Sequence, residues 1–213
     1  MKYLWVPAFL FLTALVPAAL ADDKVPGAEA IEQKESPKPK KAKPDERDRA
    51  EWRGWDHGWL RVEGTVKAAW KSGHEQRAGD CGLRAVVDYE VPVRKHLTVS
   101  PRLIPLMYWD ENNAGDNEIF AAGGGISIRG YPRAYEYRGI YGELGAMIIG
   151  QTDTFEGSTS YFNFMEEIGV GYVFQSDWNV AFKIGHISNA GLSSENAGVN
   201  WASLTLGYSF RRR

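Results

Sequence analysis

The segment "KIGHISNAGLSSENAGVNWASLTLGYSF", residues 183–210, decides the fold because it holds two strand-like halves around one loop. In both halves apolar and polar side chains alternate, as they do on the two faces of a β-strand. The residues between them, "NAGLSSENAG" at 189–198, are rich in Gly, Asn and Ser, which favour turns. The segment therefore predicts a β-hairpin with a long connecting loop.

The same pattern continues through most of the chain. Eight strand-like stretches are predicted, at residues 59–71, 82–91, 97–109, 118–129, 139–151, 161–174, 178–188 and 199–210. In the first stretch, one face carries Leu60, Val62, Val66, Ala68 and Trp70, and the other carries Arg61, Glu63, Thr65 and Lys67. The alternation is weaker in the third to fifth stretches, where Arg102, Glu143 and the glycines at 123–125 interrupt it. No long 3.6-residue period competes with it.

The charged faces decide between two kinds of barrel. A water-soluble barrel or sandwich turns its apolar faces inward, whereas a membrane barrel turns them toward lipid and keeps polar residues inside. Recurring Arg, Lys and Glu on one face suit a small interior filled by paired charges. The ending "LTLGYSF" resembles the C-terminal signal of outer-membrane barrels, although Arg211, Arg212 and Arg213 follow it. We predict an all-β fold, an eight-stranded antiparallel transmembrane β-barrel with a disordered N-terminal linker.

The N-terminal residues predict export. Residues 1–21 combine Lys2, an apolar run and a small-residue Ala-Leu-Ala end, which is typical of a cleaved signal peptide. Residues 22–50 are rich in charge and proline, which predicts a disordered periplasmic linker ahead of the barrel at 51–213. The formal net charge of -2 gives no footprint for nucleic acid, and the lone Cys81 excludes an internal disulfide. The expected location is the bacterial outer membrane.

Two polar residues interrupt the lipid-facing side of the seventh stretch. The apolar even-numbered series from Trp178 ends in His186 and Ser188, which are same-face neighbours on a strand. With both termini in the periplasm, the short "QSD" at 175–177 is a periplasmic turn. His186 then lies ~19 Å up an apolar band of ~25 Å, in the outer leaflet. A serine beside an imidazole is the minimum for an activated nucleophile.

Neighbouring strands add two more polar residues at this level. If Phe174 pairs with Trp178 across the short turn, Glu166 lies directly opposite His186. A hairpin centred in the 189–198 loop sets Asn200 opposite His186 from the other side. An ionisable residue on a lipid-facing wall is costly, so Glu166 is a candidate for function.

The string "HISNAGLSSENAGVN" at 186–200 resembles the signature of the lipid A 3-O-deacylases, the PagL-like outer-membrane enzymes. That resemblance implies hydrolysis of the ester-linked acyl chain at position 3 of lipid A, at a site on the outer wall of an eight-stranded barrel. It implies Ser188 as the nucleophile and His186 as the general base. It also associates Asn189, Gly191 and Asn196 with the oxyanion hole.

Position 200 departs from the family pattern, which has an acidic residue where this chain has Asn200. An amide orients an imidazole but does not stabilise imidazolium by charge. Two outcomes remain open: Glu166 supplies the missing carboxylate from the other side, or the enzyme is slow or inactive. The alternative function is a non-enzymatic outer-membrane barrel that acts as a structural or interaction protein.

The expected partners follow from this reading. They are lipid A or lipopolysaccharide as substrate and the outer membrane itself, with no nucleic acid and no cofactor. No metal-ligand spacing, phosphate loop or nucleotide fingerprint is present in the sequence. A homodimer is compatible with the residues, which leave the oligomeric state open.

Overall fold

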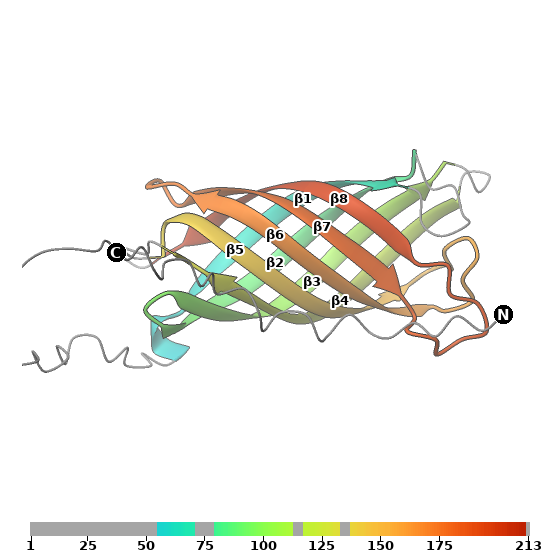
Figure 1. Cartoon of the computed structure of the whole chain (residues 1–213), viewed down its shortest axis with the longest axis horizontal. Helices are drawn as coiled ribbons and strands as arrows, with labels where there is room; N and C mark the ends of the chain where they lie inside the picture. Colours follow the sequence, from blue (N-terminus) through green and yellow to red (C-terminus); the bar gives the residue numbers. More distant parts are fainter. Residues whose placement is uncertain (1–54, 71–78, 113–116, 133–136, 212–213) are drawn as a thin grey trace, which may run out of the picture. The chain divides into compact units, whose positions relative to one another are not determined.

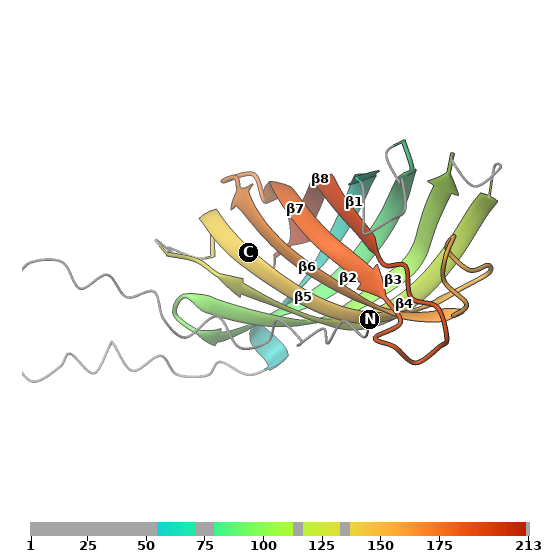
Figure 2. The ribbon, with the colours of Figure 1, turned by 45° about the vertical axis from the view of Figure 1, so that its right-hand side comes forward.

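The chain folds into one closed antiparallel barrel. The computed structural model describes residues 55–70, 79–112, 117–132 and 137–211. Each strand pairs with its sequence neighbours, and the first pairs with the last (Figures 1 and 2). The strands are β1 (Trp59–Trp70), β2 (Cys81–Arg94), β3 (Leu97–Glu111), β4 (Asn117–Gly130), β5 (Gly139–Gln151), β6 (Phe162–Val173), β7 (Trp178–Ser188) and β8 (Val199–Phe210). The predicted eight-stranded antiparallel barrel is confirmed.

A short 3-10 helix, Trp55–His57, precedes β1. No helix in the described part of the chain is long and apolar enough to cross a membrane. The predicted signal peptide at 1–21 and the predicted linker at 22–50 lie outside the described residues.

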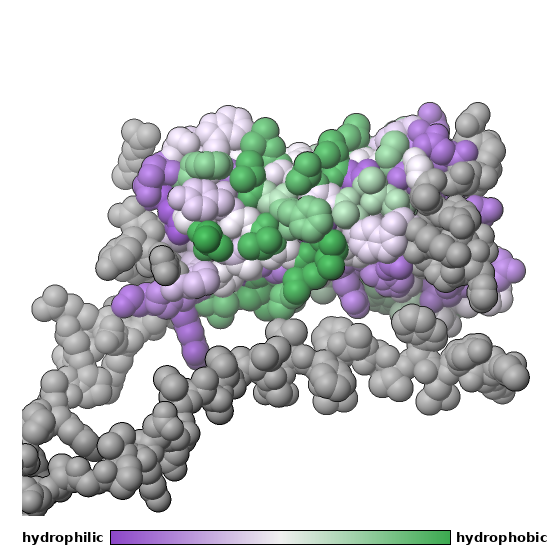
Figure 3. All heavy atoms as spheres, turned by 45° about the horizontal axis from the view of Figure 1, so that its top comes forward, coloured by the Kyte–Doolittle hydropathy of each residue, from purple (hydrophilic) through white to green (hydrophobic). Residues whose placement is uncertain are grey.

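The outer wall of the barrel is apolar along its middle. Large hydrophobic side chains are exposed on every strand, among them Leu60, Leu83, Leu103, Ile126, Ile148, Ile168, Phe182 and Leu204. Figure 3 shows apolar residues gathered over the middle of the wall and hydrophilic residues toward its two ends. A surface of this kind is unfavourable in water and favourable in hydrocarbon, where a closed barrel leaves no strand edge unpaired.

An aromatic belt marks one boundary of the apolar wall, at the end of the barrel with the short turns. Tyr172 and Phe174 on one side of the β6–β7 turn contact each other with ring centroids 5.0 Å apart. Trp178 and Tyr208 are 5.4 Å apart, and Tyr208 and Phe210 are 5.0 Å apart. Aromatic rings at such a level are typical of a membrane interface.

Ion pairs fill the barrel nearest the short turns. Arg102 donates to Asp88, Glu143 and Glu167, and Lys183 donates to Glu63 and Glu143, with no exposed side-chain surface on any of these groups. Further pairs join Arg61 to Glu90, Arg84 to Glu167 and Arg129 to Glu63. Buried charges are tolerated when they are paired and hydrogen-bonded. The charged faces predicted from the sequence therefore meet inside the barrel, as expected.

Apolar side chains fill the other half of the lumen, toward the long loops. The cluster includes Ile104, Met107, Trp109, Ile119, Ile149, Phe155, Met165, Ile187 and Trp201. Lys67 points into it, with its ammonium 4.2 Å from the Trp201 ring and 3.4 Å from the Met107 sulfur. The interior thus has a charged layer and an apolar layer stacked along the barrel axis.

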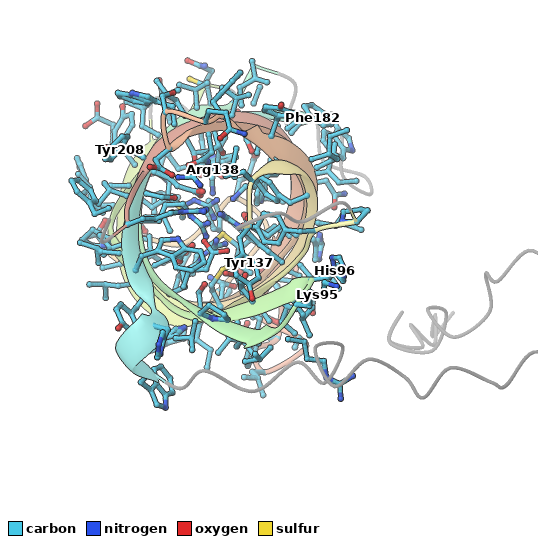
Figure 4. The ribbon with its side chains drawn as sticks, turned by 90° about the vertical axis from the view of Figure 1, so that its left-hand side faces the viewer. Lys95, His96, Tyr137, Arg138, Phe182 and Tyr208 are labelled. Carbon is cyan, nitrogen blue, oxygen red and sulfur yellow. The ribbon has the colours of Figure 1, made fainter. Side chains whose placement is uncertain are left out.

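The short-turn end of the lumen is covered by side chains from several turns. Figure 4 looks into this end, where Tyr137 and Arg138 lie within the ring of strands and Phe182 and Tyr208 lie outside it. Arg138 bonds Asp177 at 2.9 Å, and the Arg211 guanidinium lies 4.4 Å from the centre of the Trp59 ring. Arg211, the first residue after the terminal aromatic, is therefore part of this cover.

Irregular alternation in the middle strands has a structural cause. The pairing of β3 shifts register between Leu103 and Leu106 on the β2 side and between Ile104 and Met107 on the β4 side, at a β-bulge. Leu103 and Leu106 both face outward, so the odd-numbered outward series becomes even-numbered. Such a bulge inserts one residue and reverses the parity of everything after it. This shift explains why the third predicted stretch fits a period of two poorly.

Candidate active site on the outer wall

Three polar side chains form a row across β6, β7 and β8 on the lipid-facing wall. His186 pairs in register with Glu166 on one side and with Asn200 on the other. Both register predictions made from the sequence are confirmed. Glu166 is exposed, and His186 and Asn200 are half-buried. The neighbouring residues Glu167, Ile187 and Trp201 are buried and face the lumen, as alternation along a strand requires.

His186 is oriented by Asn200. The distance between Nδ1 of His186 and Oδ1 of Asn200 is 2.8 Å. An amide oxygen only accepts hydrogen bonds, so Nδ1 must carry the proton in this contact. In neutral imidazole the lone pair then lies on Nε2, which becomes the basic nitrogen. Asn200 thus selects the tautomer in which His186 accepts a proton through Nε2.

Gly198 makes room for the imidazole. A β-carbon added at Gly198 would lie 2.4 Å from Cε1 and 2.9 Å from Nε2 of His186, and 3.0 Å from the backbone oxygen of Ile187. The basic edge of the ring therefore lies against the bare backbone at this position. The sequence alone gives no spatial reason for a glycine at this position.

Ser188 ends β7 two residues beyond His186 and is half-buried. On the β6 side it pairs with Phe164, whose side chain is also on the outer wall. Among the described residues, no hydrogen bond joins the Ser188 hydroxyl to the imidazole. Catalytic contacts of this type are often long without substrate and shorten when substrate binds. The structure places both groups on one face, and no residue that it describes competes for the hydroxyl.

Glu166 lies beside His186 without bonding it. Its carboxylate forms no hydrogen bond or ion pair with any residue that the structure describes, and Nδ1 of His186 is engaged by Asn200. The register nevertheless holds the two residues directly opposite each other, where Cα atoms are roughly 4.5–5.5 Å apart.

Asn189 organises the loop that follows Ser188. It is fully buried, and its amide nitrogen donates to Ser193 Oγ at 2.5 Å and to the Glu195 carbonyl at 2.7 Å. The backbone N–H of Asn189 donates to Oδ1 of Asn196 at 2.9 Å, and that of Gly191 donates to Oδ1 of Asn189 at 2.8 Å. The two backbone N–H groups expected at an oxyanion hole are thus engaged within the loop.

The start of the loop turns sharply. Ala190 and Gly191 have φ values of 54° and 79°, and the N–H of Leu192 donates to the Asn189 carbonyl at 3.0 Å. Glycine adopts this left-handed conformation without steric cost, and this explains why the motif has glycine at position 191. Asn196 is exposed and uses its side-chain oxygen for the Asn189 bond, so its amide N–H₂ group remains a donor.

The described residues contain no group of three His, Cys, Asp or Glu side chains that could hold a metal ion. The polar row supplies one carboxylate, one imidazole and one amide, and Ser188 beside it adds a hydroxyl. Such a set is suited to proton transfer and nucleophilic attack.

A closed barrel with an apolar wall and a polar row on that wall defines an outer-membrane β-barrel protein with a lipid-facing site. The sequence model of the lipid A 3-O-deacylase (PagL) family matches residues 48–209. The chain therefore belongs to this family, which assigns it to the lipid A deacylases of the bacterial outer membrane. The resemblance drawn from residues 186–200 is confirmed.

Similar proteins include a sequence relative and a solved structure. The lipid A deacylase PagL of Bordetella bronchiseptica (strain ATCC BAA-588 / NCTC 13252 / RB50) is 24% identical over 142 residues, covering 62% of this chain and 79% of that protein. The crystal structure of the outer membrane enzyme PagL superposes with a TM-score of 0.54 at 20% identity, covering 70% of this chain and 98% of that one. At that identity the structural likeness concerns the fold.

Proposed function

We propose that this protein removes the 3-O-linked hydroxyacyl chain of lipid A by a serine mechanism on the outer wall of β7 and β8. The observation that carries the proposal is the hydrogen bond between His186 Nδ1 and Asn200 Oδ1, which leaves Nε2 basic two residues from the Ser188 hydroxyl. Family membership supports the substrate, and the lipid-facing position of the row supports access from the leaflet.

The reaction begins with attack of Ser188 Oγ on the ester carbonyl. Nε2 of His186 takes the hydroxyl proton, and the carbonyl oxygen becomes an oxyanion. The N–H₂ group of Asn196 is the proposed donor to that oxyanion, because its oxygen is fixed by the Asn189 N–H. Imidazolium then protonates the departing sugar oxygen as the tetrahedral intermediate collapses to the acyl-enzyme.

Water completes the reaction. His186 takes a proton from a water molecule, the resulting hydroxide adds to the acyl carbonyl, and the Ser188 oxygen leaves with the proton from imidazolium. The products are a free 3-hydroxy fatty acid and lipid A with one hydroxyl at the cleaved position. His186 and Ser188 are half-buried on the outer wall, so an ester from the leaflet and a water molecule can both approach them in this proposal.

Charge stabilisation of imidazolium is divided between two residues in this proposal. Asn200 fixes the tautomer but is neutral, whereas Glu166 is charged but makes no bond to the ring. A charge at several ångströms has a much larger effect beside hydrocarbon than in water, because the effective dielectric constant is low. Glu166 therefore supplies the electrostatic part of the role that one acid has in the family pattern.

Mass spectrometry of lipid A tests the proposed function. Purified full-length chain in outer-membrane-like vesicles is expected to release one 3-hydroxy fatty acid from each lipid A molecule. Substrates labelled at individual ester positions identify which chain is lost. Release from the 3-position supports the proposal, release from another position refutes the assigned ester, and unchanged lipid A favours the non-enzymatic alternative.

Replacing Asn200 by aspartate is expected to raise kcat about tenfold or more, because the carboxylate both accepts from Nδ1 and stabilises imidazolium. Glu166→Gln in the natural background is expected to lower kcat about tenfold, since the remote charge is lost. In the Asn200→Asp background the same change is expected to cost less than about threefold, because the two carboxylates have overlapping roles. Steady-state rates of the four proteins form a double-mutant cycle. Full activity of Glu166→Gln in the natural background would remove Glu166 from the mechanism, whereas equal losses in both backgrounds would mean that the two carboxylates act independently.

A further inference from the structure

The connection between β5 and β6, residues 152–161, inserts an aromatic side chain into the barrel. Phe155 is 2% exposed and belongs to the apolar cluster in the upper lumen. Its ring meets Trp109 edge-on, with centroids 6.1 Å apart. A loop normally runs over the surface, so an aromatic side chain buried at this depth is an anchor for the backbone around it.

Polar contacts fix the same loop at both sides of Phe155. The N–H of Glu156 donates to the carboxylate of Glu111, at 3.2 and 3.3 Å to its two oxygens. Thr152 exchanges two bonds with Phe120 on β4, at 2.8 and 3.0 Å. The loop is therefore held to β3 and β4 as well as to the lumen.

A tight turn follows the anchor and presents its backbone to the loop after Ser188. The N–H of Ser158 donates to the Phe155 carbonyl at 2.9 Å, with Gly157 at a φ of 68°. The Gly157 carbonyl accepts the N–H of Ala197 at 2.9 Å, and Ser158 forms a β-bridge with Asn196. Figures 1 and 2 show these two loops side by side at the long-loop end of the barrel.

The contacts continue to the nucleophile. Asn196, held by the bridge to Ser158, accepts the N–H of Asn189 at 2.9 Å, and Asn189 directly follows Ser188. A continuous series of bonds thus runs from the buried Phe155 ring to the residue next to the hydroxyl. Phe155 and its partner Trp109, at the lumen end of this series, are buried inside the barrel and do not reach the outer wall.

We infer that Phe155 is a positioning residue, which fixes the loop at 189–198 through the turn at Gly157 and so holds Asn196 and Ser188 in place. Its catalytic consequence rests on the proposed function, whereas the mechanical link between the two loops does not. Loss of the anchor frees the turn, and the oxyanion donor then samples positions away from the ester carbonyl. The expected kinetic effect is on kcat, because substrate contacts on the outer wall are unchanged.

Hydrogen exchange measured on the full-length protein in detergent or nanodiscs tests the link without any reference to activity. In Phe155→Ala, the N–H groups of Ala197 and Asn189 are expected to exchange about tenfold faster or more, while those of β2 stay protected. Phe155→Leu keeps an apolar anchor and is expected to retain most of the protection. Tyr161→Ala removes an exposed aromatic from the same loop and serves as the matched control.

Kinetics on lipid A supply the second readout. Phe155→Ala is expected to lower kcat about tenfold with KM within about twofold, and Phe155→Leu is expected to restore most of the rate. Unchanged exchange at Ala197 and Asn189 in Phe155→Ala would overturn the inference, and so would faster exchange without loss of kcat. If the natural protein leaves lipid A intact, the proposed function fails, and exchange alone then decides whether Phe155 holds the loop.

Discussion

Alanine in place of Ser188 is expected to abolish release of hydroxy fatty acid, with kcat lower by at least about three orders of magnitude. The hydroxyl oxygen is the only heavy atom that this substitution removes, and it is the proposed nucleophile. Ser188 lies at the end of β7, half-buried on the outer wall, and its hydroxyl forms no hydrogen bond with any described residue, so folding does not depend on it. The measurement is the rate of lipid A deacylation by mass spectrometry, with barrel integrity checked by heat-modifiable gel mobility.

Ser127→Ala is the matched control for this experiment. Ser127 also lies in a strand, but it is buried, and its hydroxyl has no hydrogen-bond partner among the residues that the structure describes, so its loss breaks no described contact. We expect this variant to deacylate lipid A at the natural rate. Full activity of Ser188→Ala would exclude the serine mechanism and leave His186 as a base acting on water directly.

The second large effect is expected at Gly198. An alanine there would place its β-carbon 2.4 Å from Cε1 of His186, which forces a displacement, and 3.0 Å from the Ile187 carbonyl oxygen, which is a tight contact. Backbone cannot yield easily in a paired hairpin, so the imidazole must rotate away and lose its bond to Asn200. A misplacement of about 1 Å in a catalytic group can reduce kcat about 100-fold, and we expect a loss of that order.

Gly142→Ala is the corresponding control, because a β-carbon at Gly142 meets no atom within 4 Å. Gly142 lies within β5, whereas Gly198 directly precedes β8 and borders the imidazole. Rates near that of the natural protein are expected for Gly142→Ala, together with unchanged thermal stability. If Gly198→Ala deacylates lipid A at the natural rate, the ring does not need its observed position.

Much of the fold can be predicted from the sequence, because strands that face lipid on one side and a polar lumen on the other alternate between apolar and polar residues. The short turn at 175–177 fixed the pairing of Phe174 with Trp178, and that one register placed Glu166 opposite His186. The bulge in β3 was not predicted, because one inserted residue is visible in the sequence only as an interruption of the two-residue alternation. The need for glycine at positions that face the lumen could not be predicted either. A β-carbon at Gly145 would lie 2.9 Å from Glu167 on the neighbouring strand, and no local sequence pattern encodes that contact.

The candidate site was predictable where it depends on register and not where it depends on loops. The strand register predicted for the hairpin places Asn200 opposite His186, and the hydrogen bond of 2.8 Å between them agrees with that register. The engagement of the Asn189 and Gly191 N–H groups depends on the path of residues 189–198, which no periodicity describes. The anchor at Phe155 was invisible for a similar reason, because its partner Trp109 is far away in sequence.

The packed interior has a consequence for the cell that carries this protein. Paired charges fill one half of the lumen and aromatic, aliphatic and thioether groups fill the other, so the described barrel leaves no conduit for ions or nutrients. Many copies can therefore reside in the envelope without making it leaky to antibiotics or detergents. An active site on the outer wall, as proposed, needs no opening through the barrel, so the permeability barrier stays intact.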